Sequence, residues 1–281
     1  MARRPEHLAP PEIFYGVDES RKYTSNSRMI EIQLTMSERA VELLALPEDE
    51  HLHLLDLGCG SGLSGSILED QGHTWVGVDI SKAMLDVARE REMEGDLILG
   101  DLGQGLPFRA GAFDGAISIS ALQWLCNADK AGHKPSKRLL AFFSSLYACL
   151  RRGAKAVLQF YPENNQQTEL VMAQATRAGF FGGLVIDYPH STKAKKVFLV
   201  LMTGGAQSLP KALGTGVGEQ EEDQVSYSSE RERGKRQRVQ RGKSVKHSRD
   251  WVNEKKERRR RQGKSTANDS KYTARRRCGK F

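Results

Sequence analysis

The chain has 281 residues and a net charge of +8, which comes from its C-terminal part. Residues 1–204 carry 21 Lys and Arg against 25 Asp and Glu, whereas residues 205–281 carry 22 against 10. An acidic body with a basic tail indicates that the tail meets a polyanion. The N-terminal residues lack the apolar stretch of a secretory signal, and no apolar run is long enough to span a membrane, so we expect neither secretion nor a membrane. Four cysteines, at positions 59, 126, 149 and 278, show no paired spacing, so we expect no metal site, no disulfide framework and a reducing compartment.

Strands and helices are expected to alternate along most of the chain. A first helix should begin near Asn26 or Ser27, with Ile30, Leu34, Val41 and Leu44 on one face. Seven strands follow, at about 52–57, 74–79, 96–100, 114–119, 154–160, 184–188 and 197–203, and helices at about 62–71, 81–92, 136–151 and 164–178. This order predicts an α/β fold with a doubly wound, mostly parallel seven-stranded sheet. The short connection between the last two strands predicts that they pair antiparallel.

The glycine-rich segment after the first strand is the most informative stretch. The apolar run ends at Asp56, and four glycines follow it at short intervals: Gly58, Gly60, Gly62 and Gly65. Glycines let the backbone of such a turn approach a ligand closely. The last three also fit the dinucleotide fingerprint G-x-G-x-x-G. However, Asp56 would repel a pyrophosphate and would attract the ammonium and sulfonium groups of S-adenosylmethionine, which is therefore the predicted cofactor.

Two further acids end the next two strands. Asp79 lies 23 residues after Asp56, close to the spacing of an acid that accepts ribose hydroxyls, and Asp101 could accept from the adenine amine. Because parallel strands end at one sheet edge, these acids should lie around one nucleoside. We read Cys59 as a packing residue rather than a nucleophile, since nothing adjacent lowers its pKa. The expected cofactor contacts are Asp56, Gly58, Cys59, Gly60, Asp79, Ile80, Asp101, Leu102 and Ser118.

These motifs resemble those of a known family. The glycine turn, the segment 118–125 and the segment 161–164 look like class I S-adenosylmethionine methyltransferases. More closely, the chain resembles the 18S ribosomal RNA guanine-N7 methyltransferases of eukaryotic small-subunit assembly, from Arg4-Pro5-Glu6-His7 to the basic C-terminal end. The resemblance implies 18S rRNA in the pre-40S particle as substrate, a small zinc-binding methyltransferase activator protein as heterodimer partner, and a location in the nucleus (nucleolus and nucleoplasm) and also in the cytoplasm.

The implied reaction needs no catalytic base, because guanine N7 carries a lone pair and no proton. Positioning can then supply most of the catalytic effect. Candidates for positioning the acceptor base are Ser120, Trp124, Tyr161 and Asn164, which follow the fourth and fifth strands. Trp124 or Tyr161 could stack on a flipped guanine, and Ser120 and Asn164 could bond its edge. The alternatives are that Trp124 packs in the core or on the cofactor and that the small polar residues cap helices.

The sequence predicts four regions. Residues 1–50 form an N-terminal segment and helix, residues 51–204 the methyltransferase domain, residues 205–230 a flexible linker and residues 231–281 a basic tail. The tail has too few apolar residues to bury a core, so we expect it to be disordered when free, to bind RNA with stacking from Trp251 and Tyr272, and to direct the chain to the nucleus. The alternative is a solvated tail or a nuclear import signal alone.

Two rival functions remain open at this stage. One is a small-molecule methyltransferase, against which the basic tail argues. The other is an assembly factor that acts mainly by docking on pre-ribosomal RNA. Separately, the third strand should lie at the sheet edge, where Leu97, Ile98 and Leu99 could pair with the activator protein. The alternative is that the N-terminal segment covers this strand.

Overall fold

The computed structural model describes residues 4–47, 50–191, 194–205, 208–214 and 226–227, together with positions 253, 256 and 260. Its contacts divide the chain into one unit from Met1 to Ser229 and another from Glu230 to Phe281. The first unit contains the sheet. In the second unit the three described positions are helical. The expected RNA-binding tail, including Trp251 and Tyr272, otherwise lies outside the described residues.

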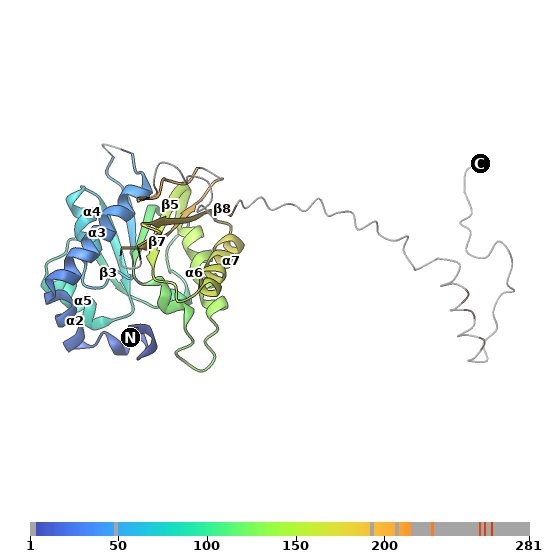
Figure 1. The fold of residues 1–281 in the computed structure, drawn as a ribbon, viewed down its shortest axis with the longest axis horizontal. Coiled ribbons are helices and arrows are strands. Elements are labelled where there is room, and N and C mark those ends of the chain that lie inside the picture. Colours follow the sequence, from blue (N-terminus) through green and yellow to red (C-terminus); the bar gives the residue numbers. More distant parts are fainter. Residues whose placement is uncertain are drawn as a thin grey trace. The chain divides into compact units, whose positions relative to one another are not determined.

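Strands and helices alternate in the expected order (Figure 1). The strands are β1 (His53–Leu57), β2 (Thr74–Asp79), β3 (Asp96–Leu99), β4 (Phe113–Ile119), β5 (Leu150–Phe160), β6 (Phe181–Asp187), β7 (Lys196–Met202) and β8 (Ser226–Tyr227). The α-helices are α1 (Pro11–Phe14), α2 (Val17–Ser25), α3 (Ser27–Leu44), α4 (Leu63–Asp70), α5 (Lys82–Glu90), α6 (Pro135–Cys149) and α7 (Asn165–Ala178). Three short 3-10 helices are η1 (Pro5–His7), η2 (Leu102–Gln104) and η3 (Leu122–Cys126).

The strand order in the sheet is β3-β2-β1-β4-β5-β7-β6-β8. The strands from β3 to β5 pair in parallel, and β7 pairs antiparallel with both β5 and β6. The predicted doubly wound, mostly parallel seven-stranded sheet is therefore confirmed, including the antiparallel last pair and β3 at an edge. The structure adds β8, a two-residue strand beside β6.

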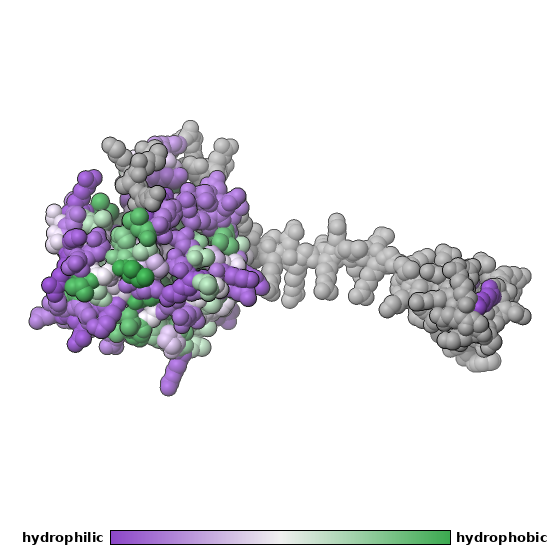
Figure 2. All heavy atoms as spheres, turned by 90° about the horizontal axis from the view of Figure 1, so that it is seen from below, coloured by the Kyte–Doolittle hydropathy of each residue, from purple (hydrophilic) through white to green (hydrophobic). Residues whose placement is uncertain are grey.

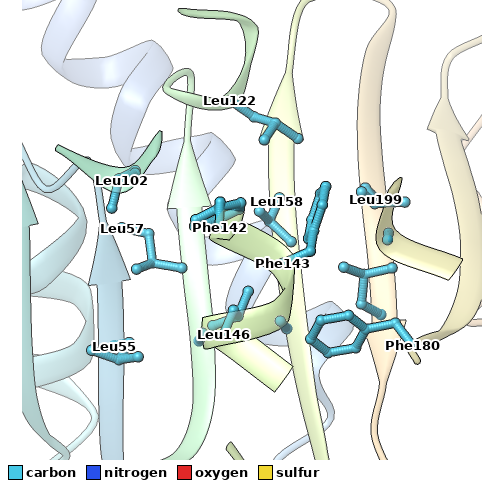
Figure 3. Close-up of a cluster of buried hydrophobic side chains, with 14 of the residues drawn as sticks. Leu55, Leu57, Leu102, Leu122, Phe142, Phe143, Leu146, Leu158, Phe180 and Leu199 are labelled. Atoms are coloured by element: carbon cyan, nitrogen blue, oxygen red, sulfur yellow. The ribbon is translucent and has the colours of Figure 1, made fainter. Parts of the chain in front are cut away.

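Each face of the sheet packs against its own layer of helices. Side chains alternate across a strand, so Leu55 and Leu57 of β1 face one core while Leu54 faces the other. In the first core, Phe142, Phe143 and other α6 side chains cover the strands (Figure 3). Residues of α3, α4 and α5 fill the second core. Both layers hold the carboxyl ends of the parallel strands at one edge, which is where ligands bind in such sheets.

The N-terminal segment contains more structure than the sequence predicted. Helix α3 begins as expected, and its N-cap Asn26 accepts a hydrogen bond from the Met29 amide. Before it, η1, α1 and α2 form a further helical segment that was not predicted from the sequence. These helices have only 3, 4 and 9 residues, too few turns to show a clear period, and α1 starts at Pro11. Figure 2, which looks from below, shows hydrophobic side chains gathered on the face where the N-terminus lies in Figure 1.

Part of the expected linker packs on the body. Leu209 and Ala212 contact the second core, and Asp187 accepts a hydrogen bond from the Leu213 amide at 2.9 Å. Arg39 also donates to the Lys211 carbonyl at 2.8 Å. The composition of this segment suggested a linker because glycines and polar residues dominate it. A few apolar side chains and backbone hydrogen bonds are enough to hold it.

Candidate active site

A pocket lies at the carboxyl ends of β3, β2, β1 and β4. Of the predicted cofactor contacts it brings together Gly58, Cys59, Gly60, Asp79, Ile80, Asp101 and Leu102. Of the predicted acceptor-side residues it contains Ser120 and Trp124. Asp56, Ser118, Tyr161 and Asn164 do not line it.

The turn after β1 is built for a close backbone approach. Gly58 and Gly60 have φ values of +78° and +53°, in the left-handed region that glycine tolerates best. At Gly58 a Cβ would also collide with the Cβ of Ala121. Cys59 between them is buried, and burial raises the pKa of its thiol well above the usual value. The thiol therefore stays protonated and is no nucleophile.

Asp79, the last residue of β2, binds the backbone of this turn through its carboxylate. Its Oδ2 accepts from the Gly60 amide at 2.9 Å, and its Oδ1 accepts from the Ser81 amide at 2.7 Å. Burial raises the pKa of Asp79, although the amides of Ser81, Gly60 and Ile80 act in the opposite direction. The carboxylate is thus fixed in orientation at the pocket wall, where it can accept further hydrogen bonds from a ligand.

Asp56 and Ser118 lie beneath the pocket rather than in its wall. Asp56 is fully buried and accepts a hydrogen bond from the Ser64 hydroxyl at 2.6 Å, while its Oδ1 has no partner among the described residues. Burial raises the pKa of Asp56 to about 7, the Ser64 bond lowers it and the charge of Asp79 raises it. Ser118 donates to the Leu57 carbonyl at 2.6 Å inside the core. Ser64, which donates this bond to Asp56, itself lines the pocket.

The end of the pocket near β3 carries a nearly buried ion pair. Asp101 Oδ1 accepts from the Gly103 amide at 2.8 Å and from Arg138 Nη2 at 2.6 Å. Arg138 is a residue of α6, and its Nη1 lies 3.1 Å from Nδ1 of His133. Neither Arg138 nor His133 was predicted from the sequence, because neither belongs to a strand end or a recognisable motif.

The N-terminal segment closes the pocket on another side. Pro11, Glu12, Tyr15 and Tyr23 line the pocket. The Tyr15 ring lies 5.8 Å from those of both Tyr23 and Trp124. Burial raises the pKa of both tyrosines, so their hydroxyls stay protonated. Sequence reasoning missed these residues, although the aromatic residues of this otherwise polar segment were an available signal.

Several contacts fasten the N-terminal segment. Lys130 Nζ lies 2.8 Å from Glu12 Oε1, and the Ser81 hydroxyl donates to the Tyr15 carbonyl at 2.7 Å. Asn127 donates to the Glu6 carbonyl at 3.1 Å. The segment is thus tied both to the loop after η3 and to the start of α5.

Three of the four predicted acceptor-side residues make other contacts within the fold. Asn164 is the N-cap of α7 and accepts from the Gln167 amide at 2.8 Å, which is the capping alternative. The Tyr161 carbonyl accepts from Arg4 at 3.0 Å, and the Lys196 ammonium lies 5.3 Å from the Tyr161 ring centroid. Trp124 is 8% exposed and packs against Phe14 and Tyr15, as the packing alternative expects.

Metal and membrane features are not found in the part of the chain that the structure describes. Among the described residues, no three His, Cys, Asp or Glu side chains gather in a way that could hold a metal ion. None of the described helices combines the length and apolarity needed to cross a bilayer.

Comparisons with known proteins identify the fold and the family. The family described as "Methyltransferase domain" matches residues 55–158, and "Methyltransferase involved in Williams-Beuren syndrome" matches residues 201–279. A solved S-adenosylmethionine-dependent methyltransferase from Aquifex aeolicus has a TM-score of 0.50 at 15% identity, covering 67% of this chain and 99% of its own, which shows the shared fold.

Relatives of known function match the chain over its whole length. The 18S rRNA (guanine-N(7))-methyltransferase of Mus musculus is 58% identical over 100% of this chain and 99% of its own length. The protein of the same name from Arabidopsis thaliana is 56% identical over 100% of both chains. At such identity and coverage, the chain belongs to the family of 18S rRNA (guanine-N7)-methyltransferases.

Proposed function

We propose that this chain transfers a methyl group from S-adenosylmethionine to N7 of a guanine in 18S rRNA during assembly of the small ribosomal subunit. The observation that carries the proposal is the Asp79 carboxylate, fixed by the Gly60 and Ser81 amides at the wall of a pocket spanning four strand ends. The close relatives supply the reaction and the RNA.

The residues of the pocket fit the methyl donor. Asp79 and Ile80 would hold the ribose, and Asp101 with Leu102 the adenine. The turn of Gly58 and Gly60, which lines the pocket and has the positive φ values that glycine tolerates best, would lie against the methionine part. When bound, S-adenosylmethionine supplies an electrophilic methyl group on a positively charged sulfur. Asp79 lines the pocket, and a carboxylate oxygen can accept more than one hydrogen bond, which suits a ligand rich in hydroxyl donors.

The acceptor base would enter beside the end of β4, next to β1 in the sheet. Guanine N7 needs no deprotonation, so the chain has to orient the base, exclude water and hold N7 in line with the methyl group. Ser120 and Trp124 line this half of the pocket. Because Phe14 and Tyr15 pack on Trp124, we assign Trp124 to the wall that positions the N-terminal segment. Tyr161 and Asn164 lie outside the pocket and are not needed for this assignment.

Mapping of N7-methylguanine on 18S rRNA tests the function. Cells that depend on this chain should lose one N7-methylguanine when it is depleted, and Asp79→Ala should fail to restore it. Asp70→Ala, an exposed acid at the end of α4, is the matched control and should restore it. An unchanged methylation map after depletion would refute the proposal.

Docking on pre-ribosomal RNA remains the second candidate, favoured by the basic tail. A Gly58→Val variant separates the two roles, because the collision with Ala121 blocks the turn. If this variant folds, loses methylation and still supports assembly, docking is the main role. Loss of both would tie assembly to the catalytic site.

For the tail, residues 231–281, we propose RNA binding with little sequence preference and nuclear targeting, with the chain in the nucleolus, nucleoplasm and also the cytoplasm. The support is the sequence, which has 21 basic against 5 acidic residues there. If the tail neutralises Z phosphates of single-stranded RNA, log K should fall with log salt at about −0.7Z. Deleting residues 231–281 should flatten this slope, and an identical slope would exclude the tail as an RNA contact.

We also propose a heterodimer with a small zinc-binding methyltransferase activator protein, through strand addition at β3. The support is that β3 is an edge strand and that Leu99 is 58% exposed. Ile98 packs against the first core, so a lysine there would damage the fold as well as the edge. Leu99→Lys is therefore the sharper variant: it should abolish the complex and leave the cofactor site intact. Full solubility and activity of the isolated chain would contradict this partnership.

A further inference from the structure

Three glutamines surround Ser120 at the end of β4. Ser120 has a φ of +56°, which residues other than glycine adopt where their surroundings enforce it, often at functional sites. The Oε1 of Gln159 accepts from the Ser120 amide at 3.0 Å and from its hydroxyl at 2.9 Å. Gln123 Nε2 donates to the Ser120 carbonyl at 2.7 Å. These bonds fix both the backbone and the hydroxyl of Ser120.

The third glutamine, Gln33 of α3, extends this network into the pocket. It is 8% exposed, lines the pocket, and its Nε2 lies 3.5 Å from Ser120 Oγ. A backbone N–H can only donate, so Gln159 must present its oxygen to Ser120. The Ser120 hydroxyl then donates to the same oxygen, and its lone pair faces Gln33. Gln33 must therefore present its NH2 group rather than its oxygen.

The network is not completed within the described part of the chain. Gln159 Nε2 and Gln123 Oε1 are buried without a partner among the described residues. Buried polar atoms normally have partners. Gln159 and Gln123 do not line the pocket, so the glutamine of the network that can meet a ligand is Gln33, which does. The bond from Gln33 to Ser120 is long and uses at most one of two N–H groups, so a donor remains for a ligand in the pocket.

The sheet order places Gln33 on the acceptor side. The proposed adenine, ribose and methionine sites follow β3, β2 and β1, and the next strand is β4. The methyl group would thus meet its acceptor beside Ser120, where Gln33 lies. N7 and O6 are neighbouring acceptors on the same edge of guanine, whereas adenine presents N7 and an N6 amine, a donor. An N–H donor at this point fits guanine and rejects adenine.

We propose that the carboxamide of Gln33 donates a hydrogen bond to O6 of the acceptor guanine and so selects guanine over adenine. The inference rests on the proposed function and names one specificity-determining residue for it. Gln159 and Ser120 act as positioning residues, because they set which end of the Gln33 amide faces outward.

The test compares three acceptor bases at the mapped position of 18S rRNA built by splinted ligation. Guanine and inosine both carry O6, and 2-aminopurine lacks it. The full-length enzyme should methylate guanine and inosine at similar rates and 2-aminopurine at least on the order of 100-fold more slowly, because the Gln33 donor then loses its partner. Gln33→Leu should slow guanine methylation by about 10–100-fold. The ratio of the methylation rates of guanine and 2-aminopurine should then be much closer to one.

Controls separate selectivity from folding. Gln33→Met has nearly the same length and should behave like Gln33→Leu, while both keep the wild-type affinity for S-adenosylmethionine in calorimetry. Gln174→Leu, at a glutamine of α7 that is also 8% exposed, should keep the full selectivity. Tyr23→Phe removes another hydroxyl that lines the pocket and should also keep it.

An unchanged base ratio in Gln33→Leu and Gln33→Met would overturn the inference, as would a collapse of the ratio in Tyr23→Phe instead. If the wild-type enzyme methylates no guanine of 18S rRNA, the proposed function fails rather than the role of Gln33.

Discussion

Asp101 Oδ1 lies 2.6 Å from Nη2 of Arg138, and their side chains are 13% and 12% exposed. The pair joins the strand end after β3 to α6 across 37 residues of sequence. It fixes the carboxylate that we assign to the adenine of the cofactor. Its accompanying bond to the Gly103 amide holds the start of η2, so the strand end and the ion pair form one rigid unit.

Replacing Arg138 with Met should therefore weaken cofactor binding. The variant leaves Asp101 without its charged partner, and loss of a charged hydrogen bond costs about 1.5–3 kcal/mol. We expect a cofactor Kd at least tenfold higher in calorimetric titration and a lower free energy of unfolding. Arg109→Met, at an exposed arginine, should change neither. An unaltered Kd for Arg138→Met would show that this pair does not organise the cofactor site.

Asp79→Ala should have the larger effect on the same measurement. It removes the ribose acceptor and also the bonds to the Gly60 and Ser81 amides, which shape the turn. The ribose contact alone should contribute about 1.5–3 kcal/mol, and disorder of the turn adds to the loss. Calorimetric titration with S-adenosylmethionine measures this loss of affinity, and Asp70→Ala is the control. Wild-type affinity in Asp79→Ala would remove the ribose assignment.

Asp79 and Asp56 show how far strand patterns can predict a site. The sequence predicts both acids at the ends of apolar strands and assigns both to the cofactor. Asp79 is the last residue of β2 and faces the pocket. Asp56 precedes Leu57, still within β1, so its side chain stays inside the fold. Because alternation along a strand turns successive side chains to opposite faces, a shift of one position separates a pocket residue from a buried one.

Residues brought in by tertiary packing could not be predicted. The alternation of strands and helices and the antiparallel last pair follow from local periodicity and connection length, and both are confirmed. Arg138 reaches Asp101 only because α6 packs across the sheet, and Gln33 reaches Ser120 from a helix 87 positions earlier. Neither contact leaves a signal in local sequence, since a polar residue on a helix is usually solvated.

The buried Asp56 should make the stability of the apo protein depend on pH. Burial raises its pKa to about 7 in the folded state, whereas an unfolded aspartate titrates near 4. Between these values the folded state binds more protons, so stability falls as pH rises from about 4 to 7. Asp56→Asn keeps an acceptor for the Ser64 hydroxyl and removes the charge.

The expected result is a smaller drop in Tm between pH 5 and pH 8 for Asp56→Asn than for the wild type. Asp79→Asn serves as a comparison, because its pKa is raised in the same direction. Thermal unfolding followed by circular dichroism at both pH values measures the difference. Equal drops in wild type and Asp56→Asn would mean that Asp56 is not protonated in the folded protein.

The ion pair of Glu12 and Lys130 should control how tightly the N-terminal segment covers Trp124. Lys130→Glu replaces the ion pair, whose charged atoms are 2.8 Å apart, with two negative charges. Because these repel each other, α1 should move away and the contacts of Phe14 and Tyr15 with the Trp124 ring should be lost. In a Trp251→Phe background, the emission of Trp124 should shift to longer wavelength and its quenching by acrylamide should increase. The emission of the buried Trp75 should not change. The charge-swapped double variant, Glu12→Lys with Lys130→Glu, should restore the wild-type values.

Salt and acid should act on the same contact. Burial alone would raise the pKa of Glu12, but the hydrogen bond and charge of Lys130 outweigh it, so the pKa is lowered. The charged pair therefore holds the N-terminal segment against Trp124 at neutral pH. This stabilisation is lost as pH falls through the lowered pKa of Glu12. High salt should screen the Glu12–Lys130 pair, because Lys130 is 59% exposed. The difference in acrylamide quenching between the wild type and Lys130→Glu should therefore become smaller. If quenching in Lys130→Glu equals that of the wild type at low salt, hydrophobic packing and the Ser81 contact hold the segment without this pair.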